Sequence, residues 1–508
     1  MNDRKIVEAF KMYQKKPQRS AVVALKEYLS AVPDQESMLE HIINEIMKLI
    51  GDETNVDKEI IEKVLTNIQK QNSISHQVFD FQSAFDAPKF EFDMNTQNLV
   101  PSTQSKSFLG KGPSKIALYR ERFQILKYSL INSKAFAKSA LKFWSDDDGS
   151  LSIVDIATLV SKQHDSTVVF IGILDYEGEI YTVEDESGVI NLSISPECQF
   201  FGGILPVGCI VVVQGKALGD YVNALVIGHP PALTTSDFMN KFWSLPYDPF
   251  GWNLNRESMS NLQSILHEEH ENALILVFSD VWIDVPSCVT EFSHVLQNYD
   301  SSPPNMIILC GSFTQKPLPF NGMKQFERDF RKFIKKISEE HSAMIENTKF
   351  VFIPSLTDPG APKVFPRIPF QDSIKNMFPE AIFMSNPCKI RFLSRTITVF
   401  RDDIMSRLAR ASPRTVPEEN EHENLLITII HQAHLTPTDL SHAPIAWEYD
   451  HAMRLFPAPD CLILADAAAP WRSEEGDTVA FNPGQFGNGG TFGLYSPAEN
   501  TCLLQKLA

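Results

Sequence analysis

The sequence lacks the features that mark several specialised protein classes. Its seven cysteines are scattered and form no Cys-x-x-Cys pair, so we expect neither a disulfide framework nor a structural zinc site. No window approaches the ~18 consecutive apolar residues that a membrane-spanning helix needs. The first residues also lack the apolar core of a signal peptide. These absences predict a soluble protein of a reducing, intracellular compartment.

Basic charge is scarce as well. The 508 residues include 63 Asp and Glu against 46 Lys and Arg, which gives a net charge of −17. Binding of duplex DNA over a large surface needs Lys and Arg to neutralise phosphates, so we do not expect it here. Any contact with nucleic acid is expected to be local and weak. The length and the 43% apolar content suit about three domains, each with a core of its own.

The first 72 residues have apolar side chains at helical spacing. The clearest stripes are Leu39, Ile42, Ile43 and Ile46, and then Ile60, Ile61, Val64 and Leu65. Asp57 is placed to cap the last helix. We predict a helical bundle over 1–72 that suits partner docking. Because the segment 73–114 is poor in aliphatic residues, we predict that it is a linker. We predict a helical connector over 115–151.

Strand spacing begins near residue 152. Five short apolar strands separated by Gly-containing turns are typical of a closed barrel of the OB type, which we predict over 152–232. OB barrels often bind single strands through basic grooves. Here the strands that usually bind carry acidic residues, so we favour a structural or protein-docking role for the barrel. These residues are Asp175, Glu177, Glu179, Glu184, Asp185 and Glu186.

From 233 to 508, short buried strands alternate with helices, which predicts a layered α/β domain. The expected strands are 273–278, 306–310, 349–353, 381–384, 396–400, 425–430, 461–465 and 477–481. One expected helix has apolar residues at 326, 330, 333, 334 and 337 and many basic residues on its other side. We interpret that basic side as a solvated face.

In such domains, functional loops follow the carboxyl ends of strands. Their order here resembles the calcineurin-like metallophosphoesterase domain, whose motifs hold two metal ions. Asp280 keeps the first carboxylate of that pattern, but Trp282 stands in place of a histidine and Ser312 in place of an aspartate. The motif Ser355-Leu356-Thr357-Asp358 lacks Asn and His, and only His434 remains near a later motif. Asn482-Pro483-Gly484 also lacks a histidine. We therefore predict a degenerate site with no catalytic, cofactor-binding or metal-binding residues.

Other catalytic patterns are weak. The sequence contains no Gly-x-Ser-x-Gly elbow, no GxxxxGK[ST] phosphate loop and no His-Glu-x-x-His helix. Asp280 and Asp284 could form an acid–base pair, but we favour a capping role. We expect His431 and His434 at a strand end as structural histidines. The freed loops carry apolar groups that serve either as packing within the domain or as anchors for a partner. These are Trp282, Phe313, Leu356 and Phe486.

An OB barrel followed by a degenerate phosphoesterase domain resembles the B (second) subunits of replicative DNA polymerases. Within that group, the loops are similar to those of second subunits of DNA polymerase epsilon, which also have a small N-terminal helical domain. The resemblance rests on motifs such as Phe278-Ser279-Asp280-Val281-Trp282, Cys310-Gly311-Ser312-Phe313, Ser385-Asn386-Pro387-Cys388, Phe400-Arg401-Asp402-Asp403 and His434-Leu435-Thr436-Pro437.

The resemblance implies a non-catalytic accessory subunit without a cofactor, acting in nuclear leading-strand DNA replication. Its implied partners are the Cys-rich C-terminal region of the catalytic subunit, the small histone-fold subunits and, through the N-terminal domain, the replicative helicase assembly. It implies no membrane contact. Two alternatives stay open: a surviving metal-dependent phosphodiesterase or nuclease, and an OB-type single-stranded DNA-binding protein.

Overall fold

The computed structural model describes most of the chain. It covers 3–13, 15–30, parts of 39–65, 78–93, 98–102, 106–132, 153–232 except 160 and 163, 251–319 except 253 and 255, 322–415 and 418–507. The fold divides into two compact units, 1–78 with 240–264, and 79–239 with 265–508. The part of the expected helical connector that follows residue 132 lies outside the described residues. None of the described helices is long and apolar enough to cross a membrane.

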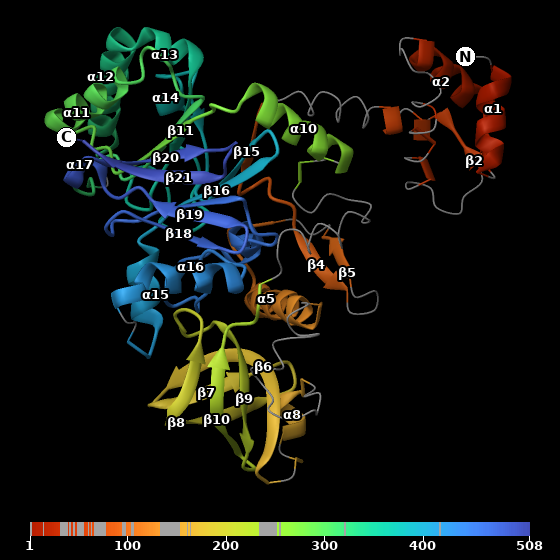
Figure 1. The fold of residues 1–508 in the computed structure, drawn as a ribbon, viewed down its shortest axis with the longest axis vertical. Helices are drawn as coiled ribbons and strands as arrows, with labels where there is room; N and C mark the ends of the chain where they lie inside the picture. Colours follow the sequence, from red (N-terminus) through yellow and green to blue (C-terminus); the bar gives the residue numbers. More distant parts are fainter. Residues whose placement is uncertain are drawn as a thin grey trace. The chain divides into compact units, whose positions relative to one another are not determined.

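The first unit contains α1 (Asp3–Met12) and α2 (Arg19–Ser30), with β1 (Lys16–Pro17) parallel to β2 (Asn55–Val56) (Figure 1). The apolar stripes of the sequence share one core here, built from residues such as Ile6, Phe10, Leu25, Leu29, Ile42, Ile43, Ile46 and Ile61. Asp57 Oδ1 accepts a hydrogen bond from the Ile60 N–H at 3.0 Å, as expected of a cap.

The predicted five-stranded barrel is confirmed. Its strands close in the order β10-β8-β7-β6-β9, and α8 (Ile156–Leu159) packs into the barrel core. Gly172 lies where β6 faces β7, and a Cβ there would overlap Val183 and the Glu184 carbonyl, so closure requires glycine. The strands are β6 (Ser166–Glu177), β7 (Ile180–Glu184), β8 (Val189–Phe201), β9 (Ile210–Ala217) and β10 (Tyr221–Gly228).

The predicted α/β domain is also confirmed, as two packed six-stranded sheets. The first has the order β14-β13-β12-β11-β20-β21 and the second β18-β19-β17-β16-β15-β3. The first consists of β11 (Ile275–Ser279), β12 (Met306–Cys310), β13 (Lys349–Ile353), β14 (Ile382–Phe383), β20 (Thr491–Ser496) and β21 (Thr501–Lys506). The second consists of β3 (Phe79–Ser83), β15 (Cys388–Phe392), β16 (Arg395–Arg401), β17 (Cys461–Ala465), β18 (Trp471–Glu475) and β19 (Thr478–Asn482).

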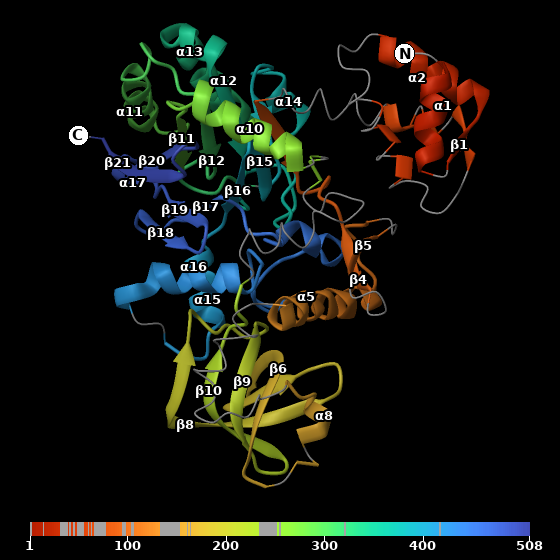
Figure 2. The same cartoon turned by 45° about the vertical axis from the view of Figure 1, so that its right-hand side comes forward.

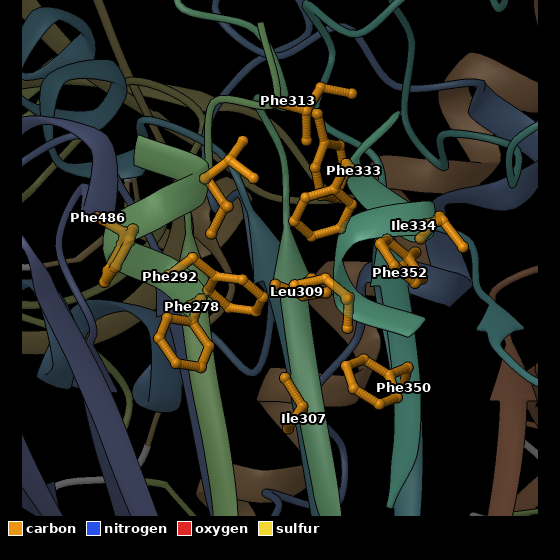
Figure 3. Packing of buried hydrophobic residues seen from close by; sticks show 14 of the residues in the cluster. Phe278, Phe292, Ile307, Leu309, Phe313, Phe333, Ile334, Phe350, Phe352 and Phe486 are labelled. Carbon is orange, nitrogen blue, oxygen red and sulfur yellow. The ribbon is translucent and has the colours of Figure 1, made fainter. Parts of the chain in front are cut away.

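Helices cover the outer face of each sheet. The first sheet packs against α11 (Pro286–Gln297), α12 (Met323–Glu340), α13 (Ser342–Asn347) and α14 (Asp372–Lys375) through a core rich in phenylalanine, which Figure 3 shows in part. The second packs against α15 (Ile404–Ala411) and α16 (Glu421–His431). The helix α10 (Arg256–Glu269) precedes β11 in the chain.

One predicted strand is wrong. Residues 425–430 form the second half of α16. A buried apolar run of six residues fits a strand or a buried helix equally well, so periodicity alone could not decide. The acidic residues Glu421 and Glu423 in the first turn, which favour a helix N-terminus, were the better signal. His431 therefore ends a helix rather than a strand.

The segment 73–114, predicted as a linker, contains regular structure in its described part. β3 pairs with β15 and extends the second sheet, with Phe81 opposite Ile390. β4 (Phe90–Asp93) pairs with β5 (Asn98–Pro101). Phe79 packs edge-on against Phe392 at 5.1 Å. The segment's overall composition concealed this edge strand, because two alternating phenylalanines supply most of its apolar side.

The helix α5 (Gly112–Asn132) lies between the barrel and the α/β sandwich (Figures 1 and 2). Its Phe123, Leu126 and Leu130 pack on the barrel, against Val169, Ile171, Ile210 and Val212. On the sandwich side, Arg122 Nε donates to Asp450 Oδ2 at 3.1 Å, in the 3-10 helix η2 (Trp447–Met453). Burial alone would raise the pKa of Asp450, but Arg122 and His434 lower it well below its ordinary value.

Direct hydrogen bonds also join the barrel to the sandwich. The Gln432 side chain accepts from the Ile210 N–H at 2.8 Å and donates to the Ile210 carbonyl at 2.7 Å. Its amide nitrogen also lies 2.8 Å from His229 Nδ1, while His229 Nε2 lies 2.8 Å from the Ile204 carbonyl. Because Gln432 is a donor here, His229 must be neutral, with its proton on Nε2.

We expect mild acid to weaken this interface. Burial lowers the pKa of His229 to about 3 in the folded chain, whereas in the unfolded chain it is ~6.5. Between these two pH values, His229 is protonated in the unfolded chain and neutral in the folded chain. The stability that His229 contributes is fully present above pH ~6.5 and is lost as the pH falls towards 3, by about 1.4 kcal/mol per pH unit. The free energy of unfolding, measured with urea at several pH values between ~7 and ~5, should fall less steeply with falling pH in His229→Asn than in the natural chain. An unchanged slope would contradict the assignment.

Candidate functional site

The carboxyl ends of the strands meet at one edge of the sandwich, as the sequence predicts. Asp280 follows β11, Ser312 follows β12, and Ser355 and Asp358 follow β13. The structure brings these four residues together with Thr357 through hydrogen bonds between their loops. From the second sheet, Arg401 at the end of β16 enters the same cluster.

The Asp280 carboxylate is fully occupied. Arg401 Nη2 lies 3.0 Å from Asp280 Oδ1 and 3.2 Å from Oδ2. The Ser312 N–H donates to Oδ1, and Gln485 Nε2 donates to Oδ2 at 3.1 Å. Asp280 is 1% exposed and has a φ of 56°, a conformation that Asp tolerates better than most residues. These protein partners alone account for its position.

Arg401 supplies the positive charge of the cluster. Its Nε donates to the Gly311 carbonyl, and its Nη1 donates to Asp403 Oδ1 at 2.8 Å and to the Ala465 carbonyl at 3.4 Å. Burial alone would lower the pKa of the guanidinium, but the carboxylates of Asp280 and Asp403 raise it above its ordinary value. Arg401 is therefore a permanent cation that joins the ends of β11, β12 and β17.

Three hydroxyls form a closed group beside this ion pair. Ser312 Oγ lies 3.1 Å from Ser355 Oγ and 2.5 Å from Thr357 Oγ1, and the last two lie 2.9 Å apart. Asp358 accepts from the Ser355 N–H at 2.7 Å and the Phe313 N–H at 2.9 Å. Burial raises the pKa of Asp358 and outweighs these bonds. A Cβ on Gly311 would overlap Asp358, so the approach of these loops requires glycine.

Three further predicted positions, His434, Asn482 and His431, have structural partners elsewhere. His434 Nδ1 accepts from the Thr436 N–H at 3.1 Å, so its Nε2 carries the proton and donates to Asp450 Oδ1 at 3.2 Å. Burial, with Arg122 nearby, lowers the pKa of His434 to about 4. Asn482 binds the loop backbone through the Asp466 and Gly484 N–H groups and two carbonyls. His431 pairs with Glu475 at 3.0 Å.

The residues present do not fit the two-metal centre that a phosphoesterase sandwich implies. Among the described residues, no group of three or more His, Cys, Asp or Glu is arranged to hold a metal. At the ends of β11, β12 and β13 the donors are two carboxylates and three neutral hydroxyls. Asp280 is neutralised by a guanidinium, and Asp358 is committed to loop N–H groups. Two metal ions need several free oxygen and nitrogen ligands that converge.

The apolar residues of these loops mostly pack within the domain. Phe313 is 1% exposed and its ring lies 5.6 Å from that of Phe370, and Phe486 is fully buried with its ring 5.4 Å from that of Phe278 (Figure 3). Trp282 covers the backbone of Gly487. Of the two alternatives left open by the sequence, these residues take the packing role. Asp284 forms no pair with Asp280, and its Oδ1 accepts from the Gln315 N–H at 3.0 Å.

Sequence reasoning did not assign roles to Arg401, Asn386 or Gln485. Asn386 Nδ2 donates to the Pro354 and Arg401 carbonyls at 3.0 and 2.7 Å, which ties the two sheets together. One signal was available for Arg401. It directly ends an apolar strand and is followed by two aspartates, so it falls at the same edge as Asp280.

Comparison with known proteins gives consistent matches. The family model for the second (B) subunits of DNA polymerases alpha and epsilon matches residues 275–472, and the model for the DNA polymerase epsilon subunit 2-like OB-fold domain matches 113–231. DNA polymerase epsilon subunit 2 of Homo sapiens is 28% identical over 519 residues, covering 99% of this chain and 98% of that protein. The corresponding DNA polymerase epsilon B-type subunit of Arabidopsis thaliana is 30% identical over 437 residues, covering 84% of this chain and 82% of that protein.

Among solved structures, an archaeal phosphodiesterase aligns with 46% of this chain and 98% of its own, at 12% identity. Its TM-score is 0.27, which is too low to support an argument.

We expect Arg401→Met to lower the free energy of unfolding by about 3–5 kcal/mol, because it leaves the Asp280 charge buried without its cation. Arg401→Lys keeps the positive charge but loses the planar guanidinium that contacts three strand ends. Its loss of unfolding free energy should therefore lie between those of Arg401→Met and the natural chain. Arg410→Met, at an exposed position of α15, is the matched control and should change stability by less than about 0.5 kcal/mol. Urea unfolding measures all three. Equal stability of Arg401→Met and the control would refute the role of this cation.

Proposed function

The chain belongs to the family of second subunits of DNA polymerase epsilon, and from this premise we propose that it is a non-catalytic accessory subunit. In this proposal it supports the catalytic subunit of the polymerase and links it to the replicative helicase during nuclear DNA replication. The proposal that the subunit is non-catalytic rests on the buried ion pair between Arg401 and Asp280.

The argument from this ion pair is electrostatic. Metal-assisted hydrolysis needs carboxylates free to bind cations and a metal-bound water of lowered pKa. Asp280 instead faces a guanidinium whose charge is permanent, and Ser312 offers a neutral hydroxyl. A metal ion placed there would meet like charge and too few ligands. The arrangement instead supports a fixed surface at this edge.

A scaffold needs its domains to keep one arrangement. The contacts of α5 and Gln432 fasten the barrel to the sandwich with packed apolar side chains and satisfied polar groups. This supports a role as a platform for the Cys-rich C-terminal region of the catalytic subunit, and for the small histone-fold subunits. The helicase link is assigned to the first unit, which has an apolar core of its own and seven Lys and Arg against three acidic residues over 1–30.

We expect the purified chain to hydrolyse neither single-stranded DNA nor a nitrophenyl phosphodiester above background in the presence of Mn²⁺. The physical reason is the shortage of free ligands around Asp280. Asp280→Ala provides the comparison, since it should leave the background rate unchanged. Manganese-dependent hydrolysis that Asp280→Ala abolishes would support the phosphodiesterase alternative instead.

We also expect the two units to bind different partners. Co-expressed with the catalytic subunit, a chain that lacks residues 1–72 should still co-purify with it but should lose the helicase components that the full chain retains. The second unit keeps its own cores in that variant. Loss of the catalytic subunit on this deletion, or full retention of the helicase components, would contradict the proposed division.

A further inference from the structure

The helix α12 has two faces of opposite character. One face is apolar and buried, formed by Phe326, Phe330, Phe333, Ile334 and Ile337. Figure 3 shows Phe333 and Ile334 of this face beside the strands of the first sheet. The opposite face is exposed and carries Lys324, Arg328, Arg331 and Lys335, which we call the basic stripe. Their spacing of four, three and four residues places them in one line about 16 Å long.

The basic stripe is less compensated than the other charges of the helix. Lys332 pairs with Asp329 at 3.4 Å and Lys336 with Glu340 at 3.9 Å. Glu327 accepts a hydrogen bond from Ser373 at 2.7 Å. Within the part of the chain that the structure describes, Lys324, Arg328 and Arg331 form no ion pair, and Lys335 has only an exposed pair with Glu339 at 3.7 Å. Of the described acidic side chains of α12, only Glu339 pairs with the stripe, so the stripe is left with excess positive charge.

The basic stripe is also held in a fixed position. On the buried side, the Phe326 ring stacks on Phe370 at 5.5 Å, and the Phe330 ring lies 5.5 Å from Phe352 of β13. These contacts fix both the rotation and the position of α12 against the sheet. A partner that binds the stripe therefore does not need to order the backbone that carries it, which reduces the entropic cost of association.

We propose that the basic stripe docks an acidic helical segment of a partner protein. A helix with Asp or Glu at the same spacing of four, three and four residues presents one line of carboxylates to the line of cations. The two arginines can each bind a carboxylate through two parallel hydrogen bonds. On a chain whose net charge is −17, this line of four cations is a local excess of positive charge.

The same observations disfavour duplex DNA as the partner. The stripe is narrow, and the carboxylate of Glu327 flanks it on α12; the neighbouring α14 carries Asp372, whose side chain is 86% exposed and pairs with Lys375 at 3.3 Å. A duplex is wide enough to bring its phosphates over these carboxylates. A single acidic helix contacts the stripe alone and avoids that repulsion.

The test uses the full chain and three fluorescent probes: a helical peptide with glutamates at positions i, i+4, i+7 and i+11, a peptide of the same composition with scrambled spacing, and a short DNA duplex. Anisotropy should show that the matched peptide binds most tightly and that added salt weakens binding. Arg328→Glu with Arg331→Glu should weaken its binding about tenfold or more. The matched control, Arg410→Glu with Lys506→Glu, makes the same change of charge at exposed positions elsewhere and should weaken it far less.

Each contrary result overturns the proposal in a different way. If the duplex binds more tightly than the matched peptide and the stripe variant loses it, the partner is nucleic acid. If both peptides bind equally, or if both double variants lose equal affinity, only net charge is being sensed. If no probe binds, the stripe is a solvated face. Urea unfolding of both double variants checks that the fold is retained.

Discussion

The ion pair between Arg401 and Asp280 holds together the edge on which the rest of the sandwich depends. Arg401 belongs to the second sheet, yet its guanidinium contacts the ends of two strands of the first, at Asp280 and at the Gly311 carbonyl. Asn386 forms a second link between the sheets, because its side-chain amide donates to the carbonyls of Pro354 and Arg401. The two layers are therefore joined at their carboxyl ends by charge-assisted and neutral hydrogen bonds. In a phosphoesterase centre, metal ions held by ligands from several strand ends would join the same loops.

A fixed guanidinium and a metal ion satisfy the same carboxylate under different conditions. A metal depends on the supply of the ion and on the protonation of its ligands, and it exchanges. The Arg401 cation is covalently part of β16 and remains charged at any pH at which the protein folds. The loops that it holds keep one arrangement whether or not metal is present. This property suits a protein whose proposed role is to present a constant surface, and it removes the open coordination positions that hydrolysis requires.

The sequence predicted the architecture where local pattern and tertiary environment agree. Strands 306–310, 349–353 and 461–465 were placed correctly, because a buried parallel strand is a continuous apolar run. Residues 425–430 were misassigned because a buried helix produces the same run. β3 was missed because the apolar character of an edge strand is confined to one face, which composition averages away. At the site, the prediction that metal ligands are missing rested on Trp282 and Ser312, whereas the cation that Arg401 supplies was not predicted.

The reason for that last failure is general. Asp280, Gly311, Ala465 and Arg401 are far apart in the sequence, and Arg401 interacts with each only because two sheets stack with their carboxyl ends together. A missing ligand can be recognised from one motif, whereas a compensating charge is recognised only once the register of two sheets is known. The same holds for Gln432, whose amide bonds to Ile210 across the interface with the barrel. Buried polar groups must find partners wherever the fold places them, so their pairing is a result of tertiary structure and cannot be read from spacing along the chain.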